Sequence, residues 1–513
     1  MSRPPFRRLA VLLALFSPVA AAEPRPAAPV LETFFPPVVV AGSTTPVAAA
    51  GKFADWPPTI WTDTPGIVLR PEKESGKFSV EVSPDVAPGP HLIRLFNPSG
   101  ASVPRFLLVA TEPPLAEVEP NDDPARAQPI PVLPAVITGR LGKTGDVDCY
   151  AIDLTAGQTL TAILDAQVIA SPVDAVLRLL DARGVEVAFN HDNGRNLDPL
   201  LTFTTAAGGR FTLQVFGFAH PATAEVRLHG SDAAVYRLTL TTGAPPRPPA
   251  PPTEGPALGR TDLAREAPRP PFTAEGAISR AGEESTHIFS AAKGDKLVLA
   301  VQAVALGSPL DAWVAVRDSA GKELARNDDG ANSGADPLLD WKAPTDGTYT
   351  AAVGNLLHRG GNDHFFRLVV RPARPRLEAV INEAGCVLEA GKSAEIKVTL
   401  RRLEGLKGTL VASVAGLPDC ISASEVTADD KQKEITLTLK APSDASPFNG
   451  LVEVRVREAE GSGSWKASHE LVSTTLNNGV PQGYRDLLIR STSGVWLTVT
   501  PPGAAEKPAK KKK

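Results

Sequence analysis

A repeat with a spacing of about 137 residues constrains the fold of this chain more than any other feature. Three motifs of the first half return in the second half with small changes. The pairs are SPVDA at 171–175 and SPLDA at 308–312, NHDN at 190–193 and NDDG at 327–330, and DPL at 198–200 and DPL at 336–338. Self-similarity at a fixed spacing indicates two copies of one domain. A chain of 513 residues is also too long for one ordinary core, so we expect several domains.

Short apolar runs, broken by turn residues, recur along the chain. With 50 prolines and 42 glycines, these breaks are frequent, which is typical of strands and turns rather than helices. We therefore expect an all-β protein of tandem β-sandwich domains, Ig-like and jelly-roll-like, joined by proline-rich linkers.

The N-terminus has the pattern of a signal peptide. Arg3, Arg7 and Arg8 precede an apolar run at 9–16 and a small-residue end at 19–22. The apolar run is too short to span a bilayer, so an uncleaved anchor is the weaker interpretation. We expect cleavage near Ala22 and export to the periplasm, the cell surface or the medium, with no transmembrane segment in the mature chain.

The same signals give the expected boundaries. These are a signal peptide at 1–22, an N-terminal Ig-like domain at 28–112, the first repeat copy at 117–242, a proline-rich linker at 243–272, the second copy at 273–371, a C-terminal Ig-like domain at 377–501, and a lysine-rich disordered tail at 502–513.

Acidic and amide side chains are concentrated at the entry to the first copy. In two places they alternate at i, i+2, which puts them on one side of an extended chain. The candidate metal ligands are Glu117, Glu119, Asn121, Asp122, Asp146 and Asp148. Ca²⁺ prefers about six to eight oxygen ligands, whereas Mg²⁺ demands stricter octahedral geometry. The alternative is a solvated linker, because Asn-Asp-Asp-Pro is also an ordinary turn sequence.

This region resembles a known family. The motif EPNDD at 119–123 together with GDVDCYAIDLTAGQTL at 145–160 resembles the bacterial pre-peptidase C-terminal domain, and the resemblance covers about 117–242. It implies a β-sandwich related to the collagen-binding modules of clostridial collagenases, in which the acidic segment chelates Ca²⁺. It also implies an appendage of proteases that carries no peptidase chemistry itself. Cys149 departs from the family, which usually has an aromatic residue there.

The second copy lacks most of these acids. GEESTH at 282–287 replaces GDVDCY at 145–150, so Ser285 stands where the first copy has Asp148, and no EPND segment precedes it. We expect a degenerate copy that keeps the fold and loses the calcium site. Both copies keep an acidic loop, at 190–198 and 327–336, which could hold a second ion. Without an EF-hand spacing we favour local turns there.

The cysteines and tryptophans leave alternatives open. Cys386 and Cys420 could pair in an oxidising compartment or remain reduced, and Cys149 is expected to be a small apolar filler. Trp56 and Trp61 could form a sugar-stacking platform, although a sandwich core is the commoner place for such residues.

The sequence carries no enzyme signature that we recognise. His469-Glu470 lacks the second histidine of a zincin, and no nucleophile elbow or phosphate-binding loop occurs. A net charge of -4 provides no global attraction to nucleic acid. We expect an exported, non-catalytic binding or scaffold protein whose partner is an extracellular or cell-envelope protein or polysaccharide. The alternative is an accessory or targeting protein for a separate secreted hydrolase or peptidase.

Overall fold

The computed structural model describes residues 26–193, 196–224, 226–245, 257–258, 267–330, 336–472 and 487–503. The expected signal peptide and the lysines of the expected tail lie outside these ranges. Within them, the helical elements are single 3₁₀ turns, η1 (Pro124–Arg126), η2 (Gln167–Ile169) and η3 (Val304–Leu306). The described part of the chain contains no helix long and apolar enough to cross a membrane.

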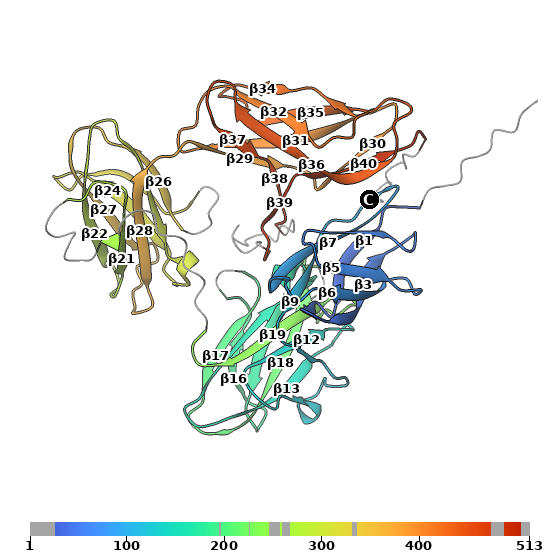
Figure 1. Ribbon diagram of the computed structural model, residues 1–513. Coiled ribbons are helices and arrows are strands. Elements are labelled where there is room, and N and C mark those ends of the chain that lie inside the picture. The colour runs from blue at the N-terminus through green and yellow to red at the C-terminus, as the bar shows by residue number, and fades with distance from the viewer. Residues whose placement is uncertain are drawn as a thin grey trace, which may run out of the picture.

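The strands of the described residues form four sandwiches in chain order (Figure 1). In the N-terminal sandwich, one sheet has the order β1 (Val30–Phe35), β3 (Thr44–Lys52), β6 (Lys77–Val82) and β5 (Ile67–Pro71). The other sheet has the order β2 (Val38–Val40), β9 (Arg105–Ala110), β7 (Gly89–Asn97) and β4 (Thr59–Thr62), with β8 (Gly100–Ala101) beside β7.

The first repeat sandwich begins at the acidic segment. One sheet has the order β10 (Leu115–Ala116), β12 (Ala135–Arg140), β19 (Val235–Thr242), β14 (Thr159–Asp165) and β17 (Leu200–Thr204). The other has the order β11 (Gln128–Pro129), β13 (Asp148–Leu154), β18 (Gly209–Ala219), β15 (Val173–Leu180) and β16 (Glu186–Asn190).

The second repeat sandwich has the same strand order, except that the described residues contain no counterpart of β11. One sheet has the order β20 (Ala257–Leu258), β21 (Phe272–Ala277), β28 (Phe365–Pro372), β23 (Lys296–Gln302) and β26 (Leu338–Lys342). The other has the order β22 (Glu284–Ala291), β27 (Gly347–Asn355), β24 (Ala312–Arg317) and β25 (Glu323–Asn327). Strand β20 falls inside the segment expected to be a linker and pairs in parallel with β21.

The C-terminal sandwich completes the chain. One sheet has the order β33 (Ser422–Ala423), β35 (Glu434–Lys440), β31 (Ser393–Leu403), β29 (Arg376–Ile381), β38 (Ser468–Glu470) and β39 (Ser491–Ser493). The other has the order β30 (Gly385–Glu389), β40 (Val495–Thr500), β36 (Phe448–Glu458), β32 (Leu410–Ala415) and β34 (Val426–Ala428), with β37 (Ser464–Lys466) beside β36. The expected all-β class of tandem sandwiches is confirmed.

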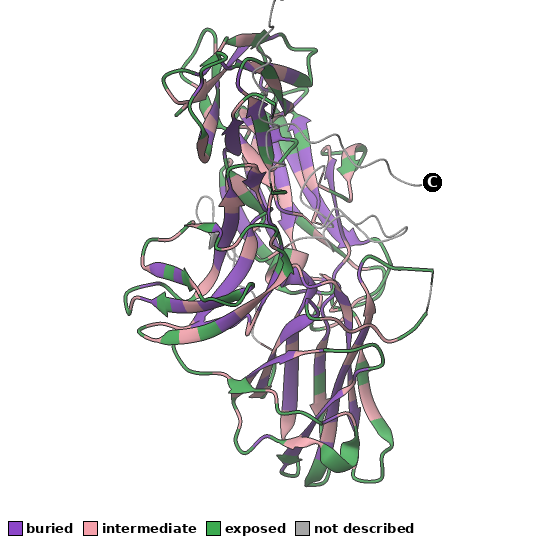
Figure 2. Ribbon diagram, turned by 90° about the vertical axis from the view of Figure 1, so that its right-hand side faces the viewer, coloured by how far each residue is buried: buried purple, intermediate pink, exposed green. Residues whose placement is uncertain are grey.

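Each sandwich has its own apolar core, built by alternation along its strands (Figure 2). In β6 the side chains of Phe78, Val80 and Val82 are buried, while those of Lys77 and Glu81 are exposed. A strand with this period-two pattern has one face on the core and one in water.

Three of the sandwiches meet at one junction. An apolar cluster there joins Phe106 and Leu108 of the N-terminal sandwich, Val168 and Ile169 of the first repeat, and Leu471 of the C-terminal sandwich. Beside it, the ring of Trp61 lies 6.1 Å from that of Trp496. Trp56, by contrast, packs against Phe78 of its own core. Trp61 is therefore an interdomain contact rather than part of a single sandwich core.

Candidate metal centre

The acidic segment lies along the edge of the first repeat sandwich because its backbone is bound on both sides. The amide of Glu117 donates to the carbonyl of Thr138 on β12 at 3.1 Å. The carbonyl of Asn121 accepts from the amide of Cys149 on β13, also at 3.1 Å. Strand β13 begins at Asp148, so this docking brings the two acidic strings together.

Four of the six predicted ligands form one cluster. Glu117, Glu119 and Asp148 each offer a carboxylate oxygen within 4.8 Å of the others. The carboxamide of Asn121, fully buried, places one terminal atom 3.3 Å from Asp148 Oδ1 and 3.1 Å from Glu119 Oε2. If this atom is nitrogen, it donates to both carboxylates. If it is oxygen, four acceptors converge with no donor among them, which is the arrangement that a hard cation binds.

The other two predicted ligands form an adjacent pair beside a lysine. Nζ of Lys143 lies 3.1 Å from an Asp122 oxygen and 3.7 Å from Asp146 Oδ1. Asp146 is fully buried, and its Oδ2 accepts from the amides of Gly142 at 2.5 Å and Lys143 at 3.3 Å. Its Oδ1 has no hydrogen-bond donor in the described chain. The ammonium group of Lys143 thus already supplies part of the positive charge that this pair needs.

The main cluster is poor in positive charge. Burial, followed by the charge of Glu117, raises the pKa of Asp148 to about 10. Burial also raises the pKa of Glu117, and the charges of Glu119 and Asp146 add to this effect. Oε2 of Glu117 accepts from the amide of Arg140 at 2.9 Å, but its buried Oε1 has no partner among the described residues. Buried carboxylates are costly unless a proton or a cation neutralises them.

Two tyrosines hold the central carboxylate in place. The hydroxyls of Tyr150 and Tyr236 lie 2.6 Å apart, and Tyr236 donates to Oδ2 of Asp148 at 2.5 Å. Both rings are completely buried. Outer partners of this kind orient metal ligands and are part of a site's design. Sequence spacing did not indicate Tyr236, which lies 88 residues from Asp148.

The second repeat shows what the fold is like without this network. Ser285 stands in place of Asp148, His287 in place of Tyr150 and Phe366 in place of Tyr236. Oγ of Ser285 lies 3.2 Å from Nε2 of His287, whose ring contacts that of Phe366. Glu283 accepts from the amides of Ser279 and Arg280 and so keeps the turn-capping role of Asp146. Capping thus belongs to the fold, whereas the buried acid and its tyrosines occur only in the first copy.

Comparison with known protein families gives a match within the second repeat sandwich. The family model described as "Bacterial pre-peptidase C-terminal domain" matches residues 285–355. The second repeat sandwich thus contains a region that matches this family. The match falls on the copy that lacks the acidic cluster, and the first copy shares its strand order. The predicted family is confirmed, and its fold does not depend on the candidate metal ligands.

Two individual proteins are also similar to this chain. A probable subtilase-type serine protease of Deinococcus radiodurans is 30% identical over 213 residues, which cover 37% of this chain and 28% of the relative. This chain therefore spans little more than a quarter of that protein. The crystal structure of a DUF4785 family protein from Legionella pneumophila matches with a TM-score of 0.14 and 11% identity, over 49% of this chain and 71% of that chain.

The acidic loop of the first repeat sandwich forms a different arrangement. Nε2 of His191 lies 3.1 Å from Asp174 Oδ1, and its Nδ1 lies 3.9 Å from Asp192 Oδ2. One ligand atom each of Asp174, His191 and Asp192 lies within 4.8 Å of the others. The loop also bonds to itself, because the amides of Asn196 and Asp198 donate to Asn193 Oδ1 and Asn196 Oδ1 at 3.0 Å. The loop thus combines an ion pair and a self-bonded turn with three side chains close enough together to hold a second ion.

The cysteines of the described chain are free thiols. Cys386 is buried and Cys420 is exposed, so the structure does not contain the disulfide that their shared domain allowed. The reason is placement, since Cys386 lies in the apolar core of the C-terminal sandwich. Cys149, in the first repeat sandwich, is fully buried and accepts from Gln214 Nε2 at 3.4 Å. Burial raises the pKa of its thiol, which is opposite to what a nucleophile needs.

Proposed function

We propose that this chain is an exported, non-catalytic binding or scaffold protein whose first repeat sandwich is stabilised by Ca²⁺. The convergence of Glu117, Glu119, Asn121 and Asp148 carries the calcium part of the proposal. The pre-peptidase C-terminal match supports a protease-associated module without catalytic groups of its own.

Calcium is the cation that best suits this donor set. The cluster is built from carboxylate and carboxamide oxygens, without the imidazole or thiolate ligands that favour zinc or copper. The carboxylates come from an extended segment and a strand end, and Ca²⁺ tolerates the irregular geometry that such a combination gives better than Mg²⁺ does. Asp122 and Asp146 are the ligands that would complete the shell, with Lys143 displaced from between them.

The partner is proposed to be an extracellular or cell-envelope protein or polysaccharide. An accessory or targeting role for a separate secreted hydrolase or peptidase is the second candidate, and the similarity to the subtilase-type relative favours it. The formal net charge of -4 supports neither a nucleic-acid nor an anionic-membrane partner.

Calorimetric titration of the full exported chain with CaCl₂ tests the metal part, with Glu119→Ala as the control. Absence of binding at millimolar Ca²⁺ would contradict it. A pull-down on cell-envelope glycans, collagen-like fibres and copurifying hydrolases, with and without Ca²⁺, tests the partner. Measurable peptidase activity that survives removal of contaminating proteases would overturn the non-catalytic role.

A further inference from the structure

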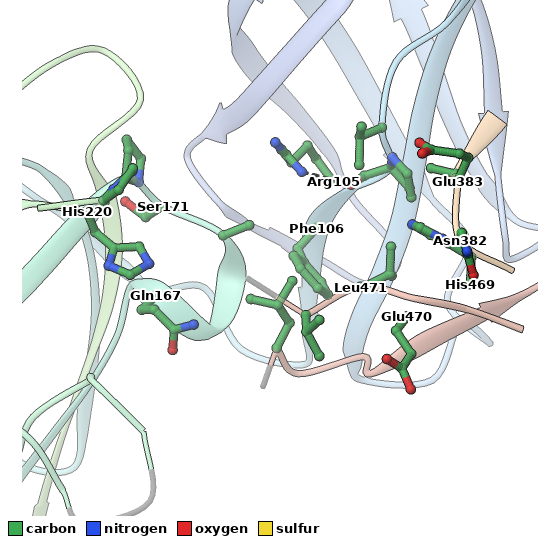
Figure 3. Close-up of a pocket in the computed structure, with 18 residues that line it drawn as sticks. Arg105, Phe106, Gln167, Ser171, His220, Asn382, Glu383, His469, Glu470 and Leu471 are labelled. Atoms are coloured by element: carbon green, nitrogen blue, oxygen red, sulfur yellow. Dashed lines mark hydrogen bonds between the residues drawn. The ribbon is translucent and has the colours of Figure 1, made fainter. Parts of the chain in front are cut away.

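A cavity of about 460 Å³ lies at the junction of three sandwiches (Figure 3). Its wall includes Phe106 of the N-terminal sandwich, Gln167 and His220 of the first repeat, and His469 and Leu471 of the C-terminal sandwich. Cavities of this size at domain interfaces are common places for small ligands to bind. The cavity is separate from the acidic cluster, with which it shares no residue.

The side chain of Gln167 lines this cavity without a hydrogen-bond partner. It is 1% exposed, and neither its Oε1 nor its Nε2 has a partner among the described residues. Its backbone is held in place, because its amide donates to Oδ1 of Asp198 at 2.7 Å. A buried carboxamide with an unused donor and an unused acceptor is destabilising, so such a group calls for an explanation.

The second repeat shows that the fold does not need this glutamine. Its equivalent turn, η3, has Val304 at the same position, and the carboxylate of Asp336 accepts from the amide of Val304 at 2.8 Å in the way that Asp198 accepts from Gln167. The turn and its capping bond therefore form without a glutamine at this position.

Three other polar groups of the wall have partners within the protein. Nδ1 of His469 bonds to the carbonyl of Ile381 at 3.0 Å, and the carboxylate of Glu470 accepts from Arg401. Oγ of Ser171 donates to the carbonyl of Ala233 at 3.3 Å. The carboxamide of Gln167 therefore offers an unused NH₂ group beside an unused oxygen, in a wall that also contains Glu383.

The rest of the wall is rich in apolar groups. Besides Phe106 and Leu471, it includes Pro104, Pro172 and Pro221. A sugar ring would bring several hydroxyls into such surroundings and leave most of them unpaired, which is costly. A secondary amide between aliphatic groups offers one N–H and one C=O with apolar flanks. Its polar atoms can pair with the carboxamide of Gln167, and its flanks can pack against the apolar part of the wall.

We propose that the junction cavity binds a short, uncharged peptide segment, with one backbone amide of the peptide hydrogen-bonded to the carboxamide of Gln167. The inference deepens the proposed binding role by naming a ligand class, and it does not depend on the calcium site. Binding would also fasten the N-terminal, first repeat and C-terminal sandwiches to one another, because all three contribute to the wall.

The test uses the full exported chain and capped trialanine, N-acetylated and C-amidated, as the probe. Saturation-transfer NMR and calorimetry should detect binding in the wild type. Gln167→Val, which copies Val304, should weaken it at least about fivefold, the effect of losing one or two hydrogen bonds. The same variant should raise the melting temperature of the unliganded chain, because it removes a buried unpaired amide. Gln167→Met serves as a second, unbranched replacement.

Two further arms make the outcome specific. A depsipeptide analogue with an ester in place of one internal amide should bind more weakly than capped trialanine, and diacetylchitobiose should not bind. Glu119→Ala should bind the peptide as the wild type does, which separates this inference from the calcium proposal. Equal affinity of wild type and Gln167→Val would overturn it, as would binding of diacetylchitobiose alone or no peptide binding up to about 10 mM.

Discussion

The hydroxyl of Tyr236 donates to Oδ2 of Asp148 at 2.5 Å, and this bond links the two sheets of the first repeat sandwich. Tyr236 lies on β19 in one sheet, and Asp148 begins β13 in the other. The bond occupies one carboxylate oxygen and leaves Oδ1 directed toward Asn121. A core tyrosine thus fixes which oxygen of the acid faces the candidate cation.

Tyr236→Phe should weaken Ca²⁺ binding while keeping the fold. The second repeat already has Phe366 at the equivalent position and the same strand order. Loss of an outer partner of a metal ligand typically costs about 10- to 100-fold in affinity. Calorimetry on the variant should show this loss with an unchanged far-ultraviolet circular dichroism spectrum. Unchanged affinity would mean that Tyr236 plays no part in metal binding.

Removal of Ca²⁺ should destabilise the wild type and leave Glu119→Gln unaffected. EDTA should lower the melting temperature of the wild type, and excess Ca²⁺ should restore it, because ligand binding stabilises the folded state by mass action. Glu186→Gln is a matched control, since Glu186 is an exposed glutamate on β16 of the same sandwich. If EDTA does not change the melting temperature of the wild type, the proposed calcium site is contradicted.

Calcium binding should release protons at neutral pH. Without a cation, the pKa of Asp148 is raised to about 10, chiefly by burial. The unfolded chain, with an aspartate pKa near 3.9, holds fewer protons across this range, so cation-free stability should fall as pH rises above about 4. Because Ca²⁺ replaces the proton, its stabilising effect should grow from pH 5 to pH 8. Titrations in two buffers of different ionisation enthalpy should reveal release of about one proton, and no release would contradict this.

The sequence predicted those features that depend on local patterns. The i, i+2 spacing predicted that Glu117 and Glu119 share one side of an extended segment, and sandwich folding was expected to bring Asp148 to them, which is where the structure places it. The repeat predicted two copies of one sandwich. It could not separate Asp122 and Asp146 from the main cluster, since that division depends on Lys143 lying between their carboxylates. Contacts between distant segments, such as Tyr236 with Asp148 and Trp61 with Trp496, depend on strand order and on how the domains dock. Local spacing in the sequence does not predict either of these.

His191 should stabilise the first repeat sandwich at acidic pH. Its hydrogen bond with Asp174 raises its pKa above the ordinary value. A histidine with a raised folded pKa contributes stability that is fully present below the unfolded pKa of about 6.5 and is lost as pH rises through the folded value. Asp174→Asn should lower the pKa of His191 in an NMR titration and flatten this part of the stability profile. An unchanged histidine titration would show that the pair does not form in solution.

Glu404 should fasten the second repeat sandwich to the C-terminal one. Its side chain is 2% exposed, and it accepts from Arg371 Nη1 at 2.6 Å and from the amide of Arg374 at 2.7 Å. Burial alone would raise the pKa of Glu404, but these donors bring it to about 2. The contact contributes stability above the unfolded glutamate pKa of about 4.3 and should be lost only as pH falls toward 2.

Glu404→Gln should therefore loosen this boundary at neutral pH. The change removes the carboxylate charge of Glu404 that faces the guanidinium of Arg371, which costs about 3–5 kcal/mol when such a pair is buried. Limited proteolysis should cut the variant between β28 and β29 faster than the wild type, and melting should split into separate transitions. Glu395→Gln, on an exposed position of β31, is the control. Equal cleavage rates would show that apolar packing, rather than this ion pair, holds the two sandwiches together.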